Sequence, residues 1–502
     1  MTTPQPLSKW TKFAFGVGSI GETTYTTIFN AFIVIYYNQA VGLSNSLIGT
    51  AILLALVGDA ISDPAIGIIS DRWRSKLGRR HPFLFVAPLP LAASIWFIFN
   101  VPDALTSGDT LNTSSGQFML FLWLAAWTIL SRIFLTLYSI PHIALGGELA
   151  RDARERSQLF SVNAMLGWSA GALFSFIAWS FFLSGETISA DGVAIPNHLK
   201  VASFGPLALF AGALVLITVS MCAIGTFSRI DTLSQPKEDL EPLNIRLFLI
   251  KLISPLWNRN YRFMAIGALL FMTSSGLYET FNVFVNTYYW EVVPEQIRWI
   301  ELAGMPGVIV GAMLAPMLMH KFDRLPVLIG AISCSMISAQ VLIDLRLLGW
   351  LPENGSELLL PMLITNKFLF LVFIGIASIA VPSMMADIID ENELISGHRE
   401  EGLFYSTTKF FSKISNSLAT LLGGLMLDRF INMPFEAVPG QLDADIINKL
   451  GISAGPIMGL FGFFSLFFYI RYSLSRKNHD DILVQLKVRN ASNVEAAVAV
   501  ES

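Results

Sequence analysis

The chain has 502 residues, of which 53% are hydrophobic and only 14% are charged, and its mean hydropathy is +0.59. Soluble domains carry roughly 25% charged residues, so this composition excludes an ordinary soluble protein and indicates one embedded in a lipid bilayer. A net charge of -4 gives no sign of a nucleic-acid partner. The two cysteines, Cys222 and Cys334, exclude a disulfide framework and a zinc cluster.

Apolar runs long enough to cross a membrane recur along the whole chain. A bilayer core of about 30 Å needs about 20 residues of helix, and each spanning segment must satisfy its own backbone hydrogen bonds. The sequence therefore predicts an all-α membrane protein with twelve transmembrane helices. The expected spans are 13–38, 45–70, 83–101, 117–146, 159–184, 200–227, 261–290, 296–320, 325–349, 361–388, 402–429 and 452–473.

Basic residues gather in alternate loops. The connections 38–46 and 102–116 contain no Lys or Arg, whereas the loop after the second span is strongly basic. Its basic residues are Arg72, Arg74, Lys76, Arg79 and Arg80. Because cytoplasmic loops carry the excess of Lys and Arg, we expect both termini to lie in the cytoplasm, with the helices in the plasma (inner) membrane.

The sequence divides into two halves of six spans. The first half ends a span with Pro141 and Glu148, and the second half does so with Pro382 and Asp387. Two such halves, with the substrate site between them, are the layout of major facilitator transporters. The expected parts are an N-terminal half over 1–227, a cytoplasmic middle loop over 228–260 with an interfacial helix over 243–257, a C-terminal half over 261–475 and a cytoplasmic tail over 476–502.

Two carboxylates share one face of the second span. Asp59 and Asp63 are four residues apart, and such a close pair in a low dielectric favours a bound cation or proton between them. Hard cations prefer oxygen ligands, so the pair predicts a site for Na⁺ or H⁺. A structural pairing with a lysine is the alternative, compatible with the first, and Lys413 is the candidate for coupling. Lys409 either lines the substrate path or extends toward an interface.

Three further spans carry polar residues at helical spacing. The first has Glu22 and Thr26, the fourth has Arg132 and Ser139, and the seventh has Glu279. Charged groups inside a membrane are costly and mark function by default. We expect Glu22 and Arg132 to face a cavity and to pair, either as substrate ligands or as a purely structural ion pair.

The basic loop after the second span also predicts a gate. Its sequence places Asp71 and Arg72 at the end of the span, with Arg79 and Arg80 before the next one. Arginines hydrogen-bond well to carboxylates on neighbouring helices. We interpret these four residues as a brace that holds one conformation, with a mere topology signal as the alternative.

The motifs Asp-Ala-Ile-Ser-Asp-Pro and Ser-Asp-Arg-Trp-Arg-Ser-Lys-Leu-Gly-Arg-Arg-His-Pro resemble the glycoside-pentoside-hexuronide:cation symporter family over nearly the whole chain. The resemblance implies a coupling cation on Asp59 and Asp63, with Thr136 as a further ligand and Lys413 nearby. The family's sugar-binding acids fall at Thr23 and Ser139 here, so the resemblance keeps the cation site and changes the substrate site.

The sequence thus predicts a cation-coupled symporter of a sugar, glycoside or uronide that works by alternating access. The expected substrate-binding residues are Glu22, Thr23, Thr26, Arg132, Ser139, His142, Glu279 and Lys409. The alternatives are a cation-coupled symporter of a lysophospholipid or other amphipathic solute, and a sensor or structural membrane protein that transports nothing. No nucleophile or phosphate-binding motif indicates an enzyme. We expect Na⁺ or H⁺ as coupling ion, no other cofactor, and a monomer whose partners are the small-molecule substrate and the lipid bilayer.

Overall fold

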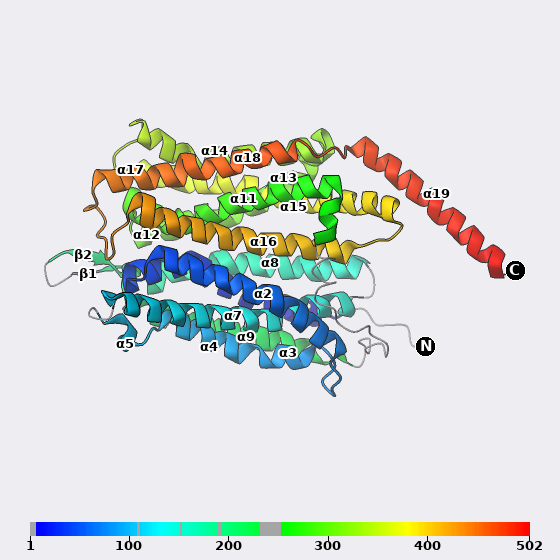
Figure 1. The fold of residues 1–502 in the computed structure, drawn as a ribbon, viewed down its shortest axis with the longest axis horizontal. Coiled ribbons are helices and arrows are strands. Elements are labelled where there is room, and N and C mark those ends of the chain that lie inside the picture. The colour runs from blue at the N-terminus through cyan, green and yellow to red at the C-terminus, as the bar shows by residue number, and fades with distance from the viewer. Residues whose placement is uncertain (1–6, 108–110, 151–152, 189–191, 231–252, 502) are drawn as a thin grey trace.

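The computed structural model describes residues 7–107, 111–150, 153–188, 192–230 and 253–501. Helices make up nearly all of this part of the chain, as expected (Figure 1). Most of the predicted middle loop, and with it most of the interfacial helix expected over 243–257, lies outside the described residues.

The described residues of the first half of the chain form eight α-helices and a short hairpin. The helices are α1 Lys9–Ile35, α2 Asn45–Arg72, α3 His81–Val86, α4 Pro88–Phe99, α5 Asp103–Thr106, α7 Ser114–Leu149, α8 Ala153–Ile177 and α9 Val201–Phe227. Strands β1 Glu186–Ile188 and β2 Ala194–Pro196 pair antiparallel. The expected third span is formed by α3 and α4, which meet at Ala87 where Pro88 begins the second helix.

The second half of the chain follows the same pattern and ends in a tail helix. Its helices are α11 Arg259–Phe284, α12 Pro294–Leu302, α13 Gly304–Phe322, α14 Arg324–Leu347, α15 Leu359–Ser396, α16 Glu401–Leu425, α17 Ala444–Ile452, α18 Met458–Tyr469 and α19 Arg476–Glu501. Short π-helical turns extend α1, α8, α11 and α16, and another joins α17 to α18.

Joined in this way, the helices form long segments at all twelve expected spans. Nine of the segments in the described residues are long and apolar enough to cross a membrane. The segments that begin with α1, α11 and α16 are not among the nine. These three carry Glu22, Glu279, Lys409 and Lys413, and such polar side chains lower the hydropathy of helices that line a polar interior.

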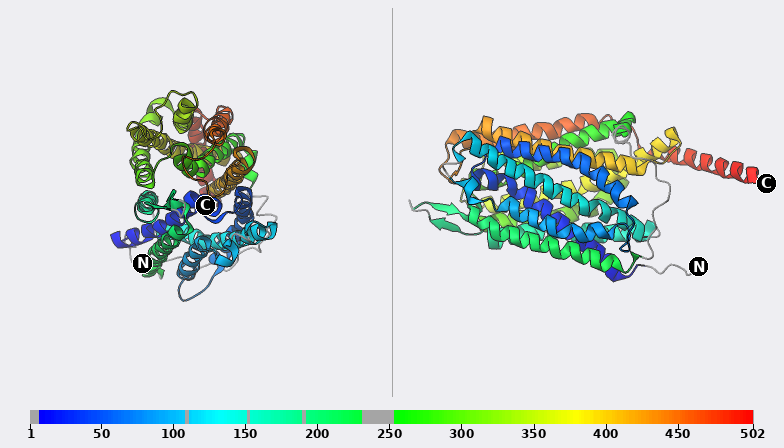
Figure 2. Two further views of the ribbon diagram at one scale, coloured as in Figure 1. Left: turned by 90° about the vertical axis from the view of Figure 1, so that its left-hand side faces the viewer. Right: turned by 60° about the horizontal axis from the view of Figure 1, so that its bottom comes forward.

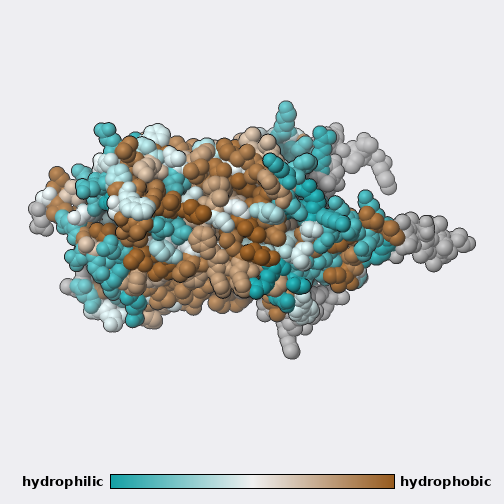
Figure 3. Space-filling model, turned by 90° about the horizontal axis from the view of Figure 1, so that it is seen from above, coloured by the Kyte–Doolittle hydropathy of each residue, from teal (hydrophilic) through white to brown (hydrophobic). Residues whose placement is uncertain are grey.

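The two halves lie side by side as two helix bundles. Figure 2 shows them end on, with α1–α9 in one bundle and α11–α18 in the other. The N- and C-termini lie at one end of the molecule and the hairpin lies at the other (Figure 1), and we call these the termini end and the hairpin end. Apolar side chains cover the middle of the surface and polar ones gather toward the ends (Figure 3), as a bilayer requires.

Helices α2 and α16 form the main contact between the two bundles. Two glycines allow their backbones to approach near the hairpin end. A Cβ atom at Gly49 would lie 2.7 Å from Leu421 Cα, and one at Gly424 would lie 2.3 Å from the carbonyl oxygen of Asn45. No larger residue fits at either position without moving one bundle away from the other.

Candidate cation and substrate site

The two predicted carboxylates meet the predicted lysine and threonine at the centre of the molecule. Lys413 of α16 places its Nζ 2.6 Å from Asp63 Oδ2 and 3.4 Å from Asp59 Oδ2. The Thr136 hydroxyl donates to Asp63 Oδ1 at 2.8 Å. Asp59 is buried, and Asp63 is about one-third exposed. The structure therefore brings together all four residues predicted for cation binding and coupling.

Arg132 takes a different partner from the expected one. Its Nη1 lies 2.8 Å from Asp59 Oδ2, and its guanidinium carbon lies 5.6 Å from the centre of the Phe29 ring. The predicted pair of Arg132 with Glu22 is wrong. The reason is packing: α7 runs along α2, whereas its contact with α1 is slight, so the acid on α2 is the one within reach.

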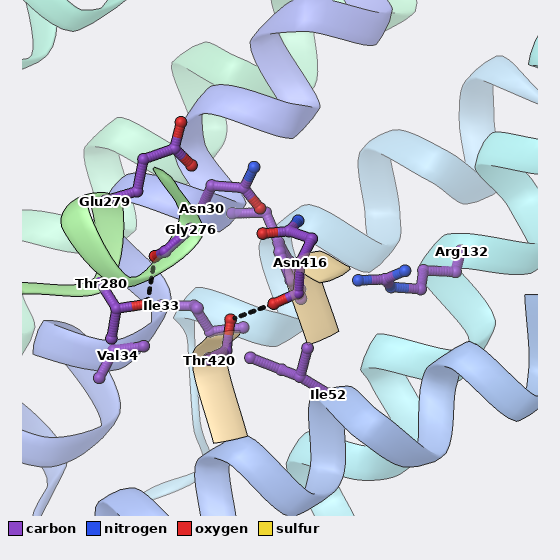
Figure 4. Close-up of a pocket in the computed structure, with 11 residues that line it drawn as sticks. Asn30, Ile33, Val34, Ile52, Arg132, Gly276, Glu279, Thr280, Asn416 and Thr420 are labelled. Carbon is purple, nitrogen blue, oxygen red and sulfur yellow. Dashed lines mark hydrogen bonds between the residues drawn. The ribbon is translucent and has the colours of Figure 1, made fainter. Parts of the chain in front are cut away.

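Both bundles line a cavity beside this ion-pair cluster. It holds about 300 Å³ of empty space, part of it open to solvent. Asn30 of α1 and Asn416 of α16 lie between Glu279 of α11 and Arg132 of α7 (Figure 4). Polar groups from four helices thus converge on one space, with apolar walls such as Ile33 and Ile52. This mixture suits a small hydroxylated or charged ligand.

The other predicted substrate residues fall into two groups. Glu22, Thr26 and Lys409 keep exposed surface in the middle of long helices, although none of them lines the cavity of Figure 4. Their exposure is compatible with a path between the bundles. Thr26 also bonds the backbone carbonyl of Glu22 at 2.9 Å.

Contrary to the prediction, Thr23, Ser139 and His142 do not line the cavity of Figure 4. Thr23 packs against α8, where a Cβ atom on Gly167 would lie 3.1 Å from the Thr23 hydroxyl. Ser139 is half-buried and lines neither this cavity nor a second one in the C-terminal bundle. His142 is 1% exposed. Its Nε2 lies 3.0 Å from the carbonyl oxygen of Phe15, and its ring stacks on that residue. His142 is a packing residue here because the helix turn after Pro141 points it at α1.

The predicted gate residues form a cluster at the termini end, inside the N-terminal bundle. Arg80 pairs with Asp71, and its Nε lies 2.9 Å from Glu148 Oε1. Arg79 Nη2 lies 2.8 Å from the same oxygen. Asp71, Arg79 and Arg80 are thus joined as expected, and Arg72, the last residue of α2, has an exposed side chain. The cluster ties the ends of α2, α3 and α7 together.

The C-terminal bundle repeats this arrangement in simpler form. Arg324, at the start of α14, places its Nη1 2.5 Å from Asp387 Oδ2 on α15. Asp387 is the residue that the sequence matched to Glu148. His479 of the tail helix α19 adds its Nδ1 at 3.5 Å from the other oxygen of Asp387. The expected internal repeat is therefore visible in how each bundle neutralises the corresponding acid.

A second set of contacts closes the hairpin end. Asp428, just after α16, accepts hydrogen bonds from the backbone amides of Asn45 and Ser46 at 3.0 and 2.7 Å. It thereby caps the first turn of α2 in the other bundle. Gln39 links the bundles again: its Oε1 accepts from the Tyr288 hydroxyl at 3.0 Å.

Sequence reasoning missed Asp428, Gln39, Asn416 and Glu148 as site residues. Glu148 was visible as an acid at the end of a span, opposite a basic loop. Asp428 left only a weak signal, an acid near the end of a span whose partner is a helix start almost 400 positions away. Gln39 and Asn416 are neutral, and neutral polar residues occur in too many membrane helices to mark a site.

The ligand set at the centre fits a monovalent cation or a proton. Among the described residues, no group of three or more His, Cys, Asp or Glu side chains is placed to hold a metal ion. Two carboxylates and a hydroxyl provide hard oxygen ligands, and because Arg132 compensates Asp59, about one negative charge remains for a cation that takes the place of Lys413.

Comparison with known proteins agrees with this architecture. The family described as MFS/sugar transport protein matches residues 14–476. An uncharacterized symporter of Synechocystis, sll1374, is 24% identical, with 96% of this chain and 97% of that protein covered. The putative glycoside/cation symporter YagG of Escherichia coli is 23% identical, with 97% and 96% covered.

Solved structures share the fold. A bacterial homologue of the human lysosomal transporter Spinster, in an inward-facing and unoccupied conformation, superimposes with a TM-score of 0.60 at 12% identity. The alignment covers 94% of this chain and all of that chain. At this identity the likeness concerns the arrangement of the helices alone.

Proposed function

The chain belongs to the MFS/sugar transport protein family, and we propose from this premise that it is a symporter that couples a cation bound at Asp59, Asp63 and Thr136 to the transport of a sugar or glycoside. Family membership and symporter relatives such as YagG support a transporter, not an enzyme. The observation that carries the residue assignment is the contact of Lys413 with both carboxylates.

The ion pairs suggest how cation binding moves the bundles. Asp59 and Asp63 belong to the N-terminal bundle, and Lys413 belongs to the C-terminal one. A buried carboxylate needs a compensating charge, because removing one partner of such a pair costs about 3–5 kcal/mol. A cation that replaces the Lys413 ammonium at Asp63 supplies that charge. It also releases a contact between the bundles, which links cation binding to their relative motion.

Arg132 keeps Asp59 compensated during this exchange. Its partner lies in the same bundle, so the pair persists when the bundles separate. Asp63, which is partly exposed and bonded to Thr136, is then the carboxylate that changes partner. The cavity beside it contains Asn30, Glu279 and Asn416. Amide and carboxylate oxygens of this kind accept hydrogen bonds from hydroxyl groups, which supports a sugar or glycoside as the substrate.

The coupling ion is Na⁺ or H⁺ in this proposal, since both suit a pair of carboxylates.

The proposed orientation places the termini end in the cytoplasm, because the basic loops lie at that end. The proposal keeps the expected bundle limits, 1–227 and 261–475, with a tail from 476, and the contacts among α1–α9 and among α11–α18 support it. The contacts that close the hairpin end support an inward-facing state.

Thermal stability of the purified protein tests the proposal. A ligand that binds the folded state raises its melting temperature by mass action. We expect a methyl glycoside or glucuronate to stabilise the wild type more strongly with Na⁺, or at lower pH, and to lose that dependence in Asp59→Asn. Asp103→Asn, at an exposed position of α5, is the control. Stabilisation by a lysophospholipid alone would instead indicate a symporter of amphipathic lipids.

A further inference from the structure

The C-terminal bundle contains a second cavity, separate from the central one. It lies among α11, α12, α14 and α15 and holds about 520 Å³ of empty space, part of it open to solvent. Helix α11 divides the two cavities: Glu279 and Thr280 line the central one, whereas Tyr278 and Asn282 line the second. No residue of the cation site or of the N-terminal bundle lines this second space.

A buried ion pair lies at its polar side. Lys367 of α15 is 8% exposed, and its Nζ lies 3.3 Å from Glu301 Oε2. Glu301 stands near the end of α12, just before the break between α12 and α13. Asn282 donates to Glu301 Oε1 at 2.8 Å, and Asn286 donates to Asn282 at 3.3 Å. Burying such a pair within a membrane helix is costly and marks function by default.

One amide in the cavity remains available to a ligand. Within the described part of the chain, the side chain of Asn366 has no hydrogen-bond partner, although it lines the cavity next to Lys367. A carboxamide offers two donors and one acceptor oxygen. Ligand pockets typically combine a few such polar groups with apolar and aromatic walls, and this cavity has both.

Aromatic rings form part of the wall. Trp290 lines the cavity and is 4% exposed. Tyr278 lies with its ring centre 5.1 Å from Lys367 Nζ and 4.6 Å from the Phe370 ring. Aromatic rings that stand beside hydrogen-bonding groups suit a molecule with an apolar C–H face and a hydroxyl edge.

We propose that this cavity is a second binding site, for a neutral hydroxylated ring of monosaccharide size. Lys367 and Glu301 neutralise each other, so the site has no net charge to offer an ionic ligand. Asn282, Asn366 and the ion pair provide donors and acceptors for neighbouring hydroxyls, and Trp290 and Tyr278 provide the surface for the ring face. The site does not include Asp59 or Asp63, so its occupancy is independent of the coupling cation.

The site is tested by the intrinsic fluorescence of the purified full-length protein, titrated with D-xylose and D-glucose as probes. The titrations use the Asp63→Asn background, which disables the proposed cation site. We expect saturable binding in this background, with and without Na⁺. Asn366→Ala should weaken it at least about tenfold, which corresponds to about 1.4 kcal/mol. Because Asn366 has no hydrogen bond to lose in the folded protein, this variant should fold.

A matched variant separates this site from the central one. Asn416→Ala removes the same side chain from the central cavity and should change only the sugar binding that this cavity keeps in the Asp63→Asn background, leaving the binding component that Asn366→Ala weakens. Trp290→Phe should reduce the fluorescence response while a rise in melting temperature with the probe persists. Loss of binding in Asn416→Ala with none in Asn366→Ala would overturn the second site, and so would the absence of binding by either probe. Neither result bears on whether Asp63 binds the coupling cation.

Discussion

The contacts that α2 makes with α16 and with the turn after it differ in kind between the hairpin end and the centre of the molecule. Near the hairpin end, Asp428 caps α2 and the backbones meet at Gly49 and Gly424. At the centre, Lys413 bridges Asp59 and Asp63. The first contact depends on shape and backbone hydrogen bonds, which no ion can replace. The second consists of side-chain charges, and a cation can take the place of one of them.

This difference indicates which contact responds to the cation and which one closes the hairpin end. In the proposed mechanism, cation binding acts on the central contact, because Asp63 can exchange Lys413 for a cation, whereas the Asp428 oxygens accept backbone amides. The hairpin-end contact then opens or closes with the bundles as a whole. Variants at the two places should therefore have different effects: central ones should change ion dependence, and hairpin-end ones should change which conformation is populated.

The largest effect is expected from Lys413→Met. In the proposed mechanism this substitution removes the ammonium that competes with the cation, so the affinity for the cation should rise. Coupled accumulation of the substrate should fall at least about tenfold, which corresponds to about 1.4 kcal/mol of coupling energy. Ion-dependent uptake of a labelled methyl glycoside into proteoliposomes measures both. Lys321→Met, at the exposed end of α13, is the control. Unchanged ion dependence would remove Lys413 from the coupling mechanism.

The next effect is expected from Gly49→Leu. Its side chain meets the α16 backbone, and overpacking of this kind costs typically about 1–3 kcal/mol. The closed hairpin end should be destabilised and transport slowed, whereas the ion concentration for half-maximal uptake should change little. Gly330→Leu is the matched control because nothing lies within 4 Å of a Cβ at Gly330. Equal damage by both variants would mean that the helix, not the contact, is sensitive.

A smaller effect is expected from Asp428→Asn. The substitution removes the charge that caps α2 but keeps one acceptor oxygen, and caps of this kind contribute about 0.5–2 kcal/mol. The melting temperature should fall by a few degrees. Asp445→Asn, which loses an exposed pair with Lys449 within one helix, should have almost no effect. A fall of the same size in both variants would contradict the role of Asp428 between the bundles.

The smallest effect concerns His198, which lies in the connection before α9. Its Nε2 lies 2.9 Å from the Thr287 hydroxyl of the other bundle, and burial lowers the pKa of His198 to about 3. A pKa below the ordinary 6.5 means that its contribution is complete above pH 6.5 and is lost as the pH falls toward 3. At pH 5.5 the closed hairpin end should therefore be less stable than at neutral pH, by about 1 kcal/mol.

The matching measurement is melting temperature against pH for wild type and His198→Gln. Glutamine keeps a hydrogen-bonding group but does not titrate, so the loss between pH 6.5 and 5.5 should shrink in the variant. An identical slope in both proteins would assign the pH dependence to other groups.

The sequence was sufficient to predict the helices and the central charges. Long apolar runs have few alternatives in a bilayer, and Asp59, Asp63 and Lys413 are too costly inside a membrane to lack partners. The contact between Asp63 and Lys413, which are 350 positions apart, could be predicted because an uncompensated charge in a low dielectric is strongly destabilising. The partner of Arg132 was predicted wrongly because two acids, Glu22 and Asp59, satisfied the same rule and only packing selects between them.

Neutral groups and helix orientation were beyond reach of the sequence. His142 was predicted to line the substrate path, with a polar packing role as the alternative, and the orientation of its helix turn places it against Phe15. The cap by Asp428 and the amides of the second cavity depend on which helix ends meet, and periodicity carries no information about that.

The most direct test of the exchange at the acid pair is uptake of a labelled methyl glycoside by proteoliposomes containing wild type or Asp63→Asn, under an imposed Na⁺ gradient, an imposed H⁺ gradient, or neither. We predict that one of the two gradients drives accumulation in the wild type and that neither does so in Asp63→Asn, whereas gradient-free exchange of substrate persists in the variant. Accumulation by Asp63→Asn with full ion dependence would contradict the account, because the cation would then bind elsewhere.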